Sequence, residues 1–289
     1  MTTTFPTSEP RWLRRTFARI SRNGAALTVS ATFLVLLVVV AVVAPLVAPY
    51  DPEATDLSAI YQGASARHLL GTDEIGRDTL SRLIWATRVS LASPLLVVVL
   101  ATVLGTAIAL TTAWRGGRFD SITTGALDIL LGFPGVLLAI LASALFGAGL
   151  TAPIAALTIA YTPYFARLTR TVAKQEVSQT YVAALTQLGY GGLRTTIRHV
   201  APNILPFAMA QAAVLFAYST VDLAALSFLG LGVQAPTADW GSMIAIGQSG
   251  VQQGHPLPAI SAGMMIIVTV MALNVVGEGI ADRAARRGR

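Results

Sequence analysis

Long apolar runs, separated by short polar segments, dominate this chain. Six of them, each of roughly 20 residues, contain few charged side chains: 25–49, 90–113, 126–146, 151–170, 205–229 and 257–279. About 20 apolar residues in a helix cross a hydrocarbon core of about 30 Å. The shorter alternating segments of a membrane barrel are not seen. The pattern therefore predicts an all-α polytopic membrane protein of six transmembrane helices.

The first run is too long for the apolar part of a secretory signal, which spans about 7 to 15 residues. We therefore interpret it as a retained span that follows a polar, arginine-rich segment. The expected division is a cytoplasmic N-terminal segment (1–24) and a transmembrane domain (25–289), with an outer loop (50–89), a cytoplasmic loop (171–204) and a second outer loop (230–256).

The basic residues give this map a direction, because loops that stay in the cytoplasm collect Lys and Arg. With both termini in the cytoplasm, sixteen of the 20 basic residues lie inside, and only Arg67, Arg77, Arg82 and Arg88 lie outside. The bias of nineteen arginines to one lysine is typical of a GC-rich bacterial genome. We predict a multi-pass protein of the bacterial cytoplasmic membrane with both termini cytoplasmic.

Composition agrees with a lipid environment and narrows the chemistry. Hydrophobic residues make up 54% of the chain, charged residues only 12%, and the mean hydropathy is +0.66, which leaves too little polar surface for a soluble protein of this size. There is no cysteine, so disulfides and thiolate sites are excluded, and the three histidines show no ligand spacing. The arginines flank apolar runs rather than form a basic domain, so we expect no nucleic-acid partner and no metal site.

The cytoplasmic stretch 171–204 is too polar to span and is expected to fold. Thr180 suits the cap of a short helix that runs to Leu188, and Gly189 suits its end. A second short helix is expected from Leu193 to Pro202. The resulting knob has an apolar face, which either packs on its own bundle or docks to a soluble partner.

The outer segment 68–91 is expected to form a turn followed by an amphipathic helix at the membrane interface, before the second span. Thr72 is its expected cap, and Asp78 and Arg82 have the i,i+4 spacing of an ion pair. In the second outer loop, Trp240 suits an ordered interfacial loop that is either a gate, a contact with another protein or a membrane anchor.

Asp222 is the acid placed deepest in an apolar run. An ionisable group at membrane depth is costly and usually faces a cavity or a partner. We therefore predict that Asp222 faces a cavity or a partner.

Several motifs carry a resemblance to a known family. YVAALTQLG at 181–189 with RHVAPNILP at 198–206 resembles the cytoplasmic EAA loop of binding-protein-dependent ABC importer permeases. HLLGTDEIGRDTLSRLIWATRVSL at 68–91, LSFLGLGVQAPTADWG at 226–241 and LNVVGEGIADRAARR at 273–287 are similar to the C-type permease of dipeptide, oligopeptide and nickel importers. The chain departs from the pattern at Ala183, where the family usually has Glu, and at Leu185. Family members also often place a Glu at the position of Leu223, next to Asp222.

The resemblance implies a type I ABC importer permease fold and three sets of functional residues. Coupling to an ATPase is implied for Tyr181, Ala183, Ala184, Leu185, Gly189, Arg194 and Arg198. Asp222 and Phe228 are candidates for the translocation path or its gate. Candidates for contact with a binding protein are Asp73, Glu74, Arg77, Asp78, Gln234, Asp239 and Trp240.

The implied partners are a second homologous permease, two ABC ATPase subunits, an extracytoplasmic substrate-binding protein and the lipid bilayer. No enzyme activity or cofactor is expected on this chain, since the sole lysine, Lys174, follows Ala173 and cannot complete the phosphate-binding motif GxxxxGK[ST]. ATP and Mg would bind the partner ATPases.

The expected cargo is a di- or oligopeptide or a similar small solute, and a nickel or other metal chelate is the alternative within the same architecture. An ion-coupled secondary transporter is a rival of a different class. An intramembrane hydrolase is disfavoured because neither a GxSxG elbow nor a His-rich metal motif occurs.

Overall fold

The computed structural model describes residues 24–287, with side chains as far as Arg283, so the predicted N-terminal segment lies outside the described residues. The described part is helical, apart from one isolated antiparallel bridge between Thr72 and Asp78. Its α-helices are α2 (Gly24–Val47), α3 (Thr79–Arg115), α4 (Gly117–Leu131), α5 (Gly135–Phe146), α6 (Thr151–Val177), α7 (Thr180–Gln187), α8 (Gly192–Thr195), α9 (Ala201–Phe228), α10 (Trp240–Gln252) and α11 (Leu257–Arg287). The prediction of an all-helical polytopic protein is confirmed.

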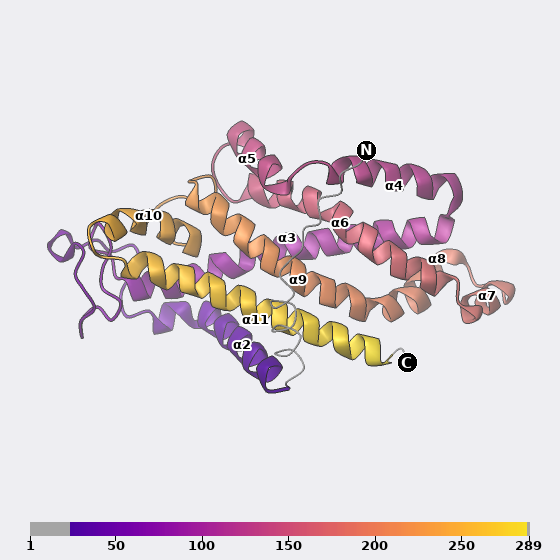
Figure 1. Cartoon of the computed structure of the whole chain (residues 1–289), viewed down its shortest axis with the longest axis horizontal. Coiled ribbons are helices and arrows are strands. Elements are labelled where there is room, and N and C mark those ends of the chain that lie inside the picture. Colours follow the sequence, from indigo (N-terminus) through magenta and orange to yellow (C-terminus); the bar gives the residue numbers. More distant parts are fainter. Residues whose placement is uncertain (1–23, 288–289) are drawn as a thin grey trace, which may run out of the picture.

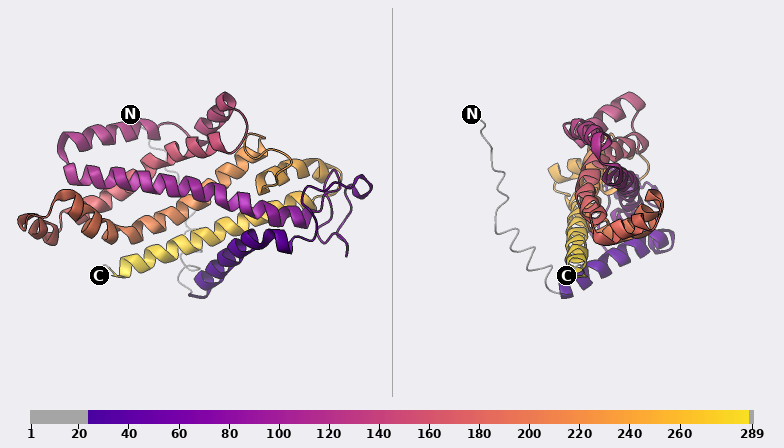
Figure 2. Two further views of the ribbon diagram at one scale, coloured as in Figure 1. Left: turned by 180° about the vertical axis from the view of Figure 1, so that it is seen from behind. Right: turned by 90° about the vertical axis from the view of Figure 1, so that its right-hand side faces the viewer.

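The long helices run side by side and leave two different ends (Figure 1). Helices α3, α6 and α9 pack on one another in the middle, α4 and α5 lie along one edge, and α2 lies along the opposite edge beside α11, as the reverse view also shows (Figure 2). One end carries α10 and the connecting segments 48–78, 229–239 and 253–256, and we call it the α10 end. The other carries α7 and α8, and we call it the α7 end.

Four helical segments within the described residues are long and apolar enough to cross a membrane: Gly24–Val47, Thr79–Arg115, Gly192–Phe228 and Leu257–Arg283. The pair formed by α4 and α5 is a fifth candidate if it counts as one broken span. Helix α6 has the length, at 27 residues, but its C-terminal half carries Arg167, Arg170 and Lys174. Because α6 packs against α3, α4, α5 and α9, it can carry polar groups that lipid would not accept. The count of six spans stays a prediction.

The third apolar run, 126–146, was predicted as one transmembrane helix, but it breaks at Pro134. Helix α4 ends at Leu131, Pro134 caps α5 with an extended backbone, and the two helices are bent by 75°. Proline has no N–H to donate to the preceding turn, so a helix that reaches it loses a backbone hydrogen bond. At Pro163, by contrast, α6 continues without interruption.

Small residues bring the central helices into close contact. A Cβ on Gly105 of α3 would lie 3.0 Å from the backbone nitrogen of Ala166 and 3.1 Å from Phe165 of α6. Phe165, Ala166 and Ala101 are fully buried at this crossing. Close backbone approach through Gly and Ala is the usual way in which membrane helices associate, because lipid offers no hydrophobic driving force between them.

Two local predictions at the α7 end need correction. Helix α7 is capped by Gln179, and Thr180 is its first residue. The second short helix does not end at Pro202, because α8 passes through a π-helical turn (Thr196–Val200) directly into α9. The N–H of Ala201 donates to the carbonyl of Thr196, five residues back, so the helix accommodates the proline by widening rather than stopping.

Two predictions at the α10 end are also wrong. The expected interfacial helix and second span are one helix of 37 residues, α3, and its cap is Asp78 rather than Thr72. The loop around Trp240 is in fact helix α10, which Asp239 and Ser242 begin with a reciprocal capping box.

Candidate functional sites at the ends and centre of the bundle

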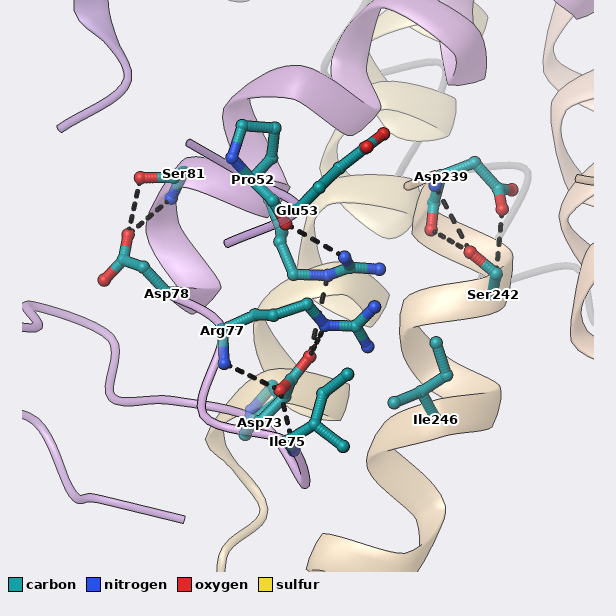
Figure 3. A network of polar contacts seen from close by, with 12 residues as sticks. Pro52, Glu53, Asp73, Ile75, Arg77, Asp78, Ser81, Asp239, Ser242 and Ile246 are labelled. Carbon is teal, nitrogen blue, oxygen red and sulfur yellow. Dashed lines mark hydrogen bonds and ion pairs between the residues drawn. The ribbon is translucent and has the colours of Figure 1, made fainter. Parts of the chain in front are cut away.

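A buried charge cluster at the α10 end centres on Asp73 (Figure 3). Its carboxylate accepts from the backbone N–H groups of Ile75 and Arg77 at 3.1 and 3.0 Å and from Arg77 Nε at 2.7 Å. Arg82 Nε lies 3.7 Å from the same carboxylate, and its Nη1 donates to the carbonyl of Pro52 at 3.1 Å. One acid thus holds two buried arginines and the turn that leads into α3.

Asp78 does not pair with Arg82, contrary to the i,i+4 prediction. It caps α3 instead by accepting from the N–H and hydroxyl of Ser81, both at 2.7 Å. Its other oxygen lies 2.9 Å from Nδ1 of His68, whose ring contacts that of Tyr50. Because its carboxylate caps the helix, Asp78 is not available for an ion pair with Arg82.

Asp239 and Trp240 fix the start of α10 against α3. Asp239 accepts from the N–H groups of Gly241 and Ser242, both at 3.1 Å, and burial raises the pKa of its carboxyl above the usual range. The backbone N–H of Trp240 donates to Ser90 Oγ of α3 at 3.0 Å, and its side chain is 0% exposed. Trp240 is therefore a buried packing residue in this structure and not a membrane anchor.

Burial divides the residues predicted to contact a binding protein. The side chains of Asp73, Arg77, Asp78, Asp239 and Trp240 are buried, whereas Glu74 and Gln234 are exposed. The Ser249 hydroxyl of α10 donates to Glu74 Oε2 at 2.9 Å, which fastens the exposed turn to the helix beneath it. The buried residues fix the shape of this surface, and direct contact through Glu74 and Gln234 stays a prediction.

At the α7 end, a small polar network joins three elements. The hydroxyl of Tyr181 in α7 donates to Glu176 Oε1 of α6 at 2.5 Å. Nδ2 of Asn203 in α9 donates to the same oxygen at 2.6 Å and to the hydroxyl of Tyr181 at 3.1 Å. Burial and the hydrogen bond to Glu176 raise the pKa of Tyr181 to about 12, so its hydroxyl remains a donor at neutral pH. Neither Glu176 nor Asn203 was predicted as a site residue, although Asn203 lies inside the RHVAPNILP motif.

Most of the predicted coupling residues lie on the surface of this end. Ala183, Ala184, Gly189, Arg194 and Arg198 are exposed, Tyr181 is just exposed and Leu185 is half-buried. Two large apolar side chains beside them are each 75% exposed, Leu188 and Leu193. Within α7 only the side chain of Val182 is buried. We call the exposed surface formed by residues 181–198 the α7 surface; apolar side chains and two arginines share it.

Two glycines shape the α7 surface in different ways. Gly189 has φ of +81° and ends α7. Its backbone N–H donates to the carbonyl of Thr186, and the N–H of Tyr190 donates to the carbonyl of Leu185. Gly192 permits close packing, because a Cβ there would lie 2.2 Å from Nε1 of Trp114 in α3. Of the two, only Gly189 was predicted, as the end of α7.

Half-buried Asp222 of α9 accepts a hydrogen bond from the hydroxyl of Tyr161 in α6. Among the described residues no basic side chain pairs with Asp222. Phe228, the other predicted path residue, lies two turns further along α9 and is exposed. Tyr161 was not predicted, since nothing in the sequence marks which α6 residue faces Asp222.

A second carboxylate, Asp120 in the first turn of α4, has the opposite surroundings. Arg170 of α6 donates to its two oxygens through Nε and Nη2, each at 2.6 Å, and Lys174 Nζ lies 2.6 Å from one of them. The same pair of helices carries a further, exposed ion pair between Arg167 and Asp128 at 3.2 Å. These bridges fix α4 to the α7 end of α6.

The comparison with known families identifies the chain. A family model described as "Binding-protein-dependent transport system inner membrane component" matches residues 101–289. The chain belongs to this family. A second model, described as the N-terminal TM domain of oligopeptide transport permease C, matches residues 11–64. As a permease component the chain is an inner-membrane multi-pass protein and is not itself catalytic, and no cofactor is expected on it.

Relatives of this permease cover nearly its whole length. It is 36% identical over 279 residues to the di/tripeptide transport system permease protein DppC of Pseudomonas aeruginosa, which covers 94% of this chain and 91% of the relative. It is 34% identical over 249 residues to the nickel transport system permease protein NikC of Escherichia coli K12, covering 86% and 90%. It is 34% identical over 265 residues to the glutathione transport system permease protein GsiD of Escherichia coli O1:K1, covering 91% and 87%.

Proposed function

We propose that this chain forms one half of the membrane pore of an ABC importer for a di- or oligopeptide or a similar small solute. A second homologous permease supplies the other half, two ABC ATPases bind below, and an extracytoplasmic binding protein delivers the solute from above. The observation that carries the proposal is the α7 surface. It exposes apolar side chains on a segment that belongs to a permease without an ATPase motif of its own.

Coupling is proposed to pass through the network of Glu176, Tyr181 and Asn203. A rigid-body movement of α7 with a bound ATPase would be transmitted to the ends of α6 and α9, because the network joins all three elements. Exposed Leu188 and Leu193 supply the apolar contact area that a stable interface needs, and Arg194 supplies charge at its rim.

The proposed topology places the α7 end in the cytoplasm and the α10 end outside. Residues 25–289 form the permease domain with six spans, of which α4 with α5 and α6 would be the third and fourth, and both termini lie inside. The solute path is proposed to follow the face of α6 and α9 that carries Asp222 and Phe228, at the interface with the second permease.

The solute class rests on the relatives. Their names include di/tripeptide, nickel and glutathione transport at 34% to 36% identity, so identity alone favours none of them. A peptide is our first choice, and a nickel or other metal chelate is the alternative within the same architecture. An ion-coupled secondary transporter would not depend on a binding protein, which is the property for which this family is named.

Purification of the permease from its native membrane tests the proposal. We expect ATPase subunits to copurify, and hydrolysis to increase when solute-loaded binding protein is added. Leu188→Asp should abolish ATPase association by burying an unpaired charge in the interface, whereas Ser178→Asp, just outside the α7 surface, should not. Transport by this chain alone, driven by an ion gradient, would contradict the proposal.

A further inference from the structure

Four side chains form a polar strip across the α6 and α9 face: Tyr161, Tyr164, Tyr218 and Asp222. Tyr164 follows Tyr161 by three residues on α6, and Tyr218 precedes Asp222 by four on α9, so each pair lies on one side of its helix. The phenol of Tyr218 is close enough to interact electrostatically with those of Tyr161 and Tyr164. Tyr164 is 41% and Tyr218 58% exposed, so the strip opens on the face that we assign to the path.

The carboxylate of Asp222 has unused capacity to accept hydrogen bonds. An ionised carboxylate has about four lone-pair sites, and among the described residues only the Tyr161 hydroxyl donates to it. Asp120, by comparison, receives three charge-assisted hydrogen bonds from Arg170 and Lys174. Asp222 thus has one neutral donor and no cation from the described part of its own chain.

We propose that the polar strip binds a protonated amine of the solute as it passes between the two permeases, with Asp222 as the anionic partner. This inference rests on the proposed function, which places the path along this face. An ammonium group has three donors, and the free oxygen of Asp222 with the phenol oxygens of Tyr164 and Tyr218 can accept them. Tyrosine rings add an attraction for cations through their π faces.

The chemistry of the strip favours an ammonium over a bare metal ion. The described residues contain no group of three or more His, Cys, Asp or Glu side chains placed to hold a metal. Divalent cations require several strong ligands, and nickel favours imidazole, whereas one carboxylate surrounded by phenols satisfies a single ammonium. A solute that carries a free amino terminus therefore fits the strip, and an anionic solute without an amine does not.

Carbodiimide labelling of the intact transporter tests the subsite without relying on transport. Dicyclohexylcarbodiimide modifies carboxyl groups in apolar surroundings, and peptide mass spectrometry measures the label on Asp222. Dialanine, with a free ammonium, should slow this labelling about tenfold at ten times its dissociation constant, by mass action. N-acetyl-dialanine, which lacks the ammonium, should leave the rate unchanged.

Equal protection by the two probes, or protection by neither, would overturn the subsite. Tyr218→Phe supplies a second measurement that keeps the carboxylate in place: loss of one acceptor should raise the dialanine concentration for half-protection about two- to tenfold, while N-acetyl-dialanine stays without effect. Selective protection without peptide uptake would contradict the proposed solute class, and peptide uptake without selective protection would contradict the subsite alone.

Discussion

The two ends of this permease are built in opposite ways. At the α10 end, charged residues such as Asp73, Arg77 and Arg82 are buried and paired with one another and with backbone groups. At the α7 end the corresponding polar network is at the surface, and exposed Leu188 and Leu193 extend beyond it. The contacts at the α10 end join connecting segments that are separated in the sequence. At the α7 end, the short helix α7 packs against few other elements.

This contrast indicates which end tolerates movement. Separation of a buried ion pair leaves charges unsolvated, so the α10 end resists rearrangement. Segments with few buried apolar contacts open at much lower free energy than a packed core. A transporter that couples an ATPase to its spans benefits from a compliant α7 end and a rigid α10 end, and the substitutions below separate the two.

The largest effect is expected for Asp73→Asn. Loss of the charge leaves the buried guanidinium groups of Arg77 and Arg82 without their ion-pair partner, which should cost about 3 kcal/mol or more of stability. The apparent Tm of the purified complex measures it. Glu74→Gln is the matched control, because Glu74 is exposed and should change stability by less than about 0.5 kcal/mol. Equal losses for both variants would mean that the Asp73 cluster is not the anchor of this end.

A smaller effect, confined to the α7 end, is expected for Gly192→Ala. The new Cβ would lie 2.2 Å from Nε1 of Trp114 and would push α8 away from α3, at a cost of about 1–3 kcal/mol. Hydrolysis stimulated by loaded binding protein should fall. Gly191→Ala is the control, since its Cβ meets nothing within 4 Å. If Gly191→Ala impairs stimulation as much as Gly192→Ala does, packing on Trp114 is not what positions the α7 surface.

Gly189 tests the backbone rather than the packing. A Cβ at this position is in open space, but φ of +81° strains any L-residue, so Gly189→Val should cost about 1–2 kcal/mol locally. We expect hydrolysis that is uncoupled from transport in an assembled complex. Gly189→Asn should retain more coupling because Asn tolerates this backbone conformation. Unaltered transport by Gly189→Val would contradict the assignment of this segment to coupling.

The smallest effect is expected for Tyr181→Phe. It removes the hydrogen bond that the hydroxyl donates to Glu176 and the one that it accepts from Asn203, and because Asn203 still donates to Glu176 the change should cost only about 0.5–1.5 kcal/mol. The ratio of solute transported to ATP hydrolysed is the readout, and it should fall while the Tm remains near that of the unaltered protein. Tyr190→Phe is the matched control, because its hydroxyl makes no hydrogen bond with the described residues. A fall of the same size in both would assign the effect to general polarity of the surface.

Much of the secondary structure could be predicted because its signals are local. The apolar runs predicted most of the ends of α2, α3, α9 and α11 to within a few residues; the exceptions are the start of α3 and the end of α11. Gly189 correctly marked the end of α7. The sequence also contains the capping signal of α10, Asp239 followed three residues later by Ser242. The segment was nevertheless predicted as a loop around Trp240. The size of the bend at Pro134 could not be predicted, since the sequence does not say whether neighbouring helices hold the two halves in line.

What the amino-acid sequence determined by itself is the class of protein: helical, membrane-spanning, without an ATPase motif, and similar to importer permeases at separated motifs. Only the tertiary structure decided which charges meet. Asp78 and Arg82 have the right spacing, yet Asp78 caps α3 and Arg82 turns to Asp73. Tyr161 reaches Asp222 from 61 residues away. Spacing along one helix fixes only local neighbours, whereas a buried charge takes its partner from whichever element packs beside it, and that depends on the whole bundle.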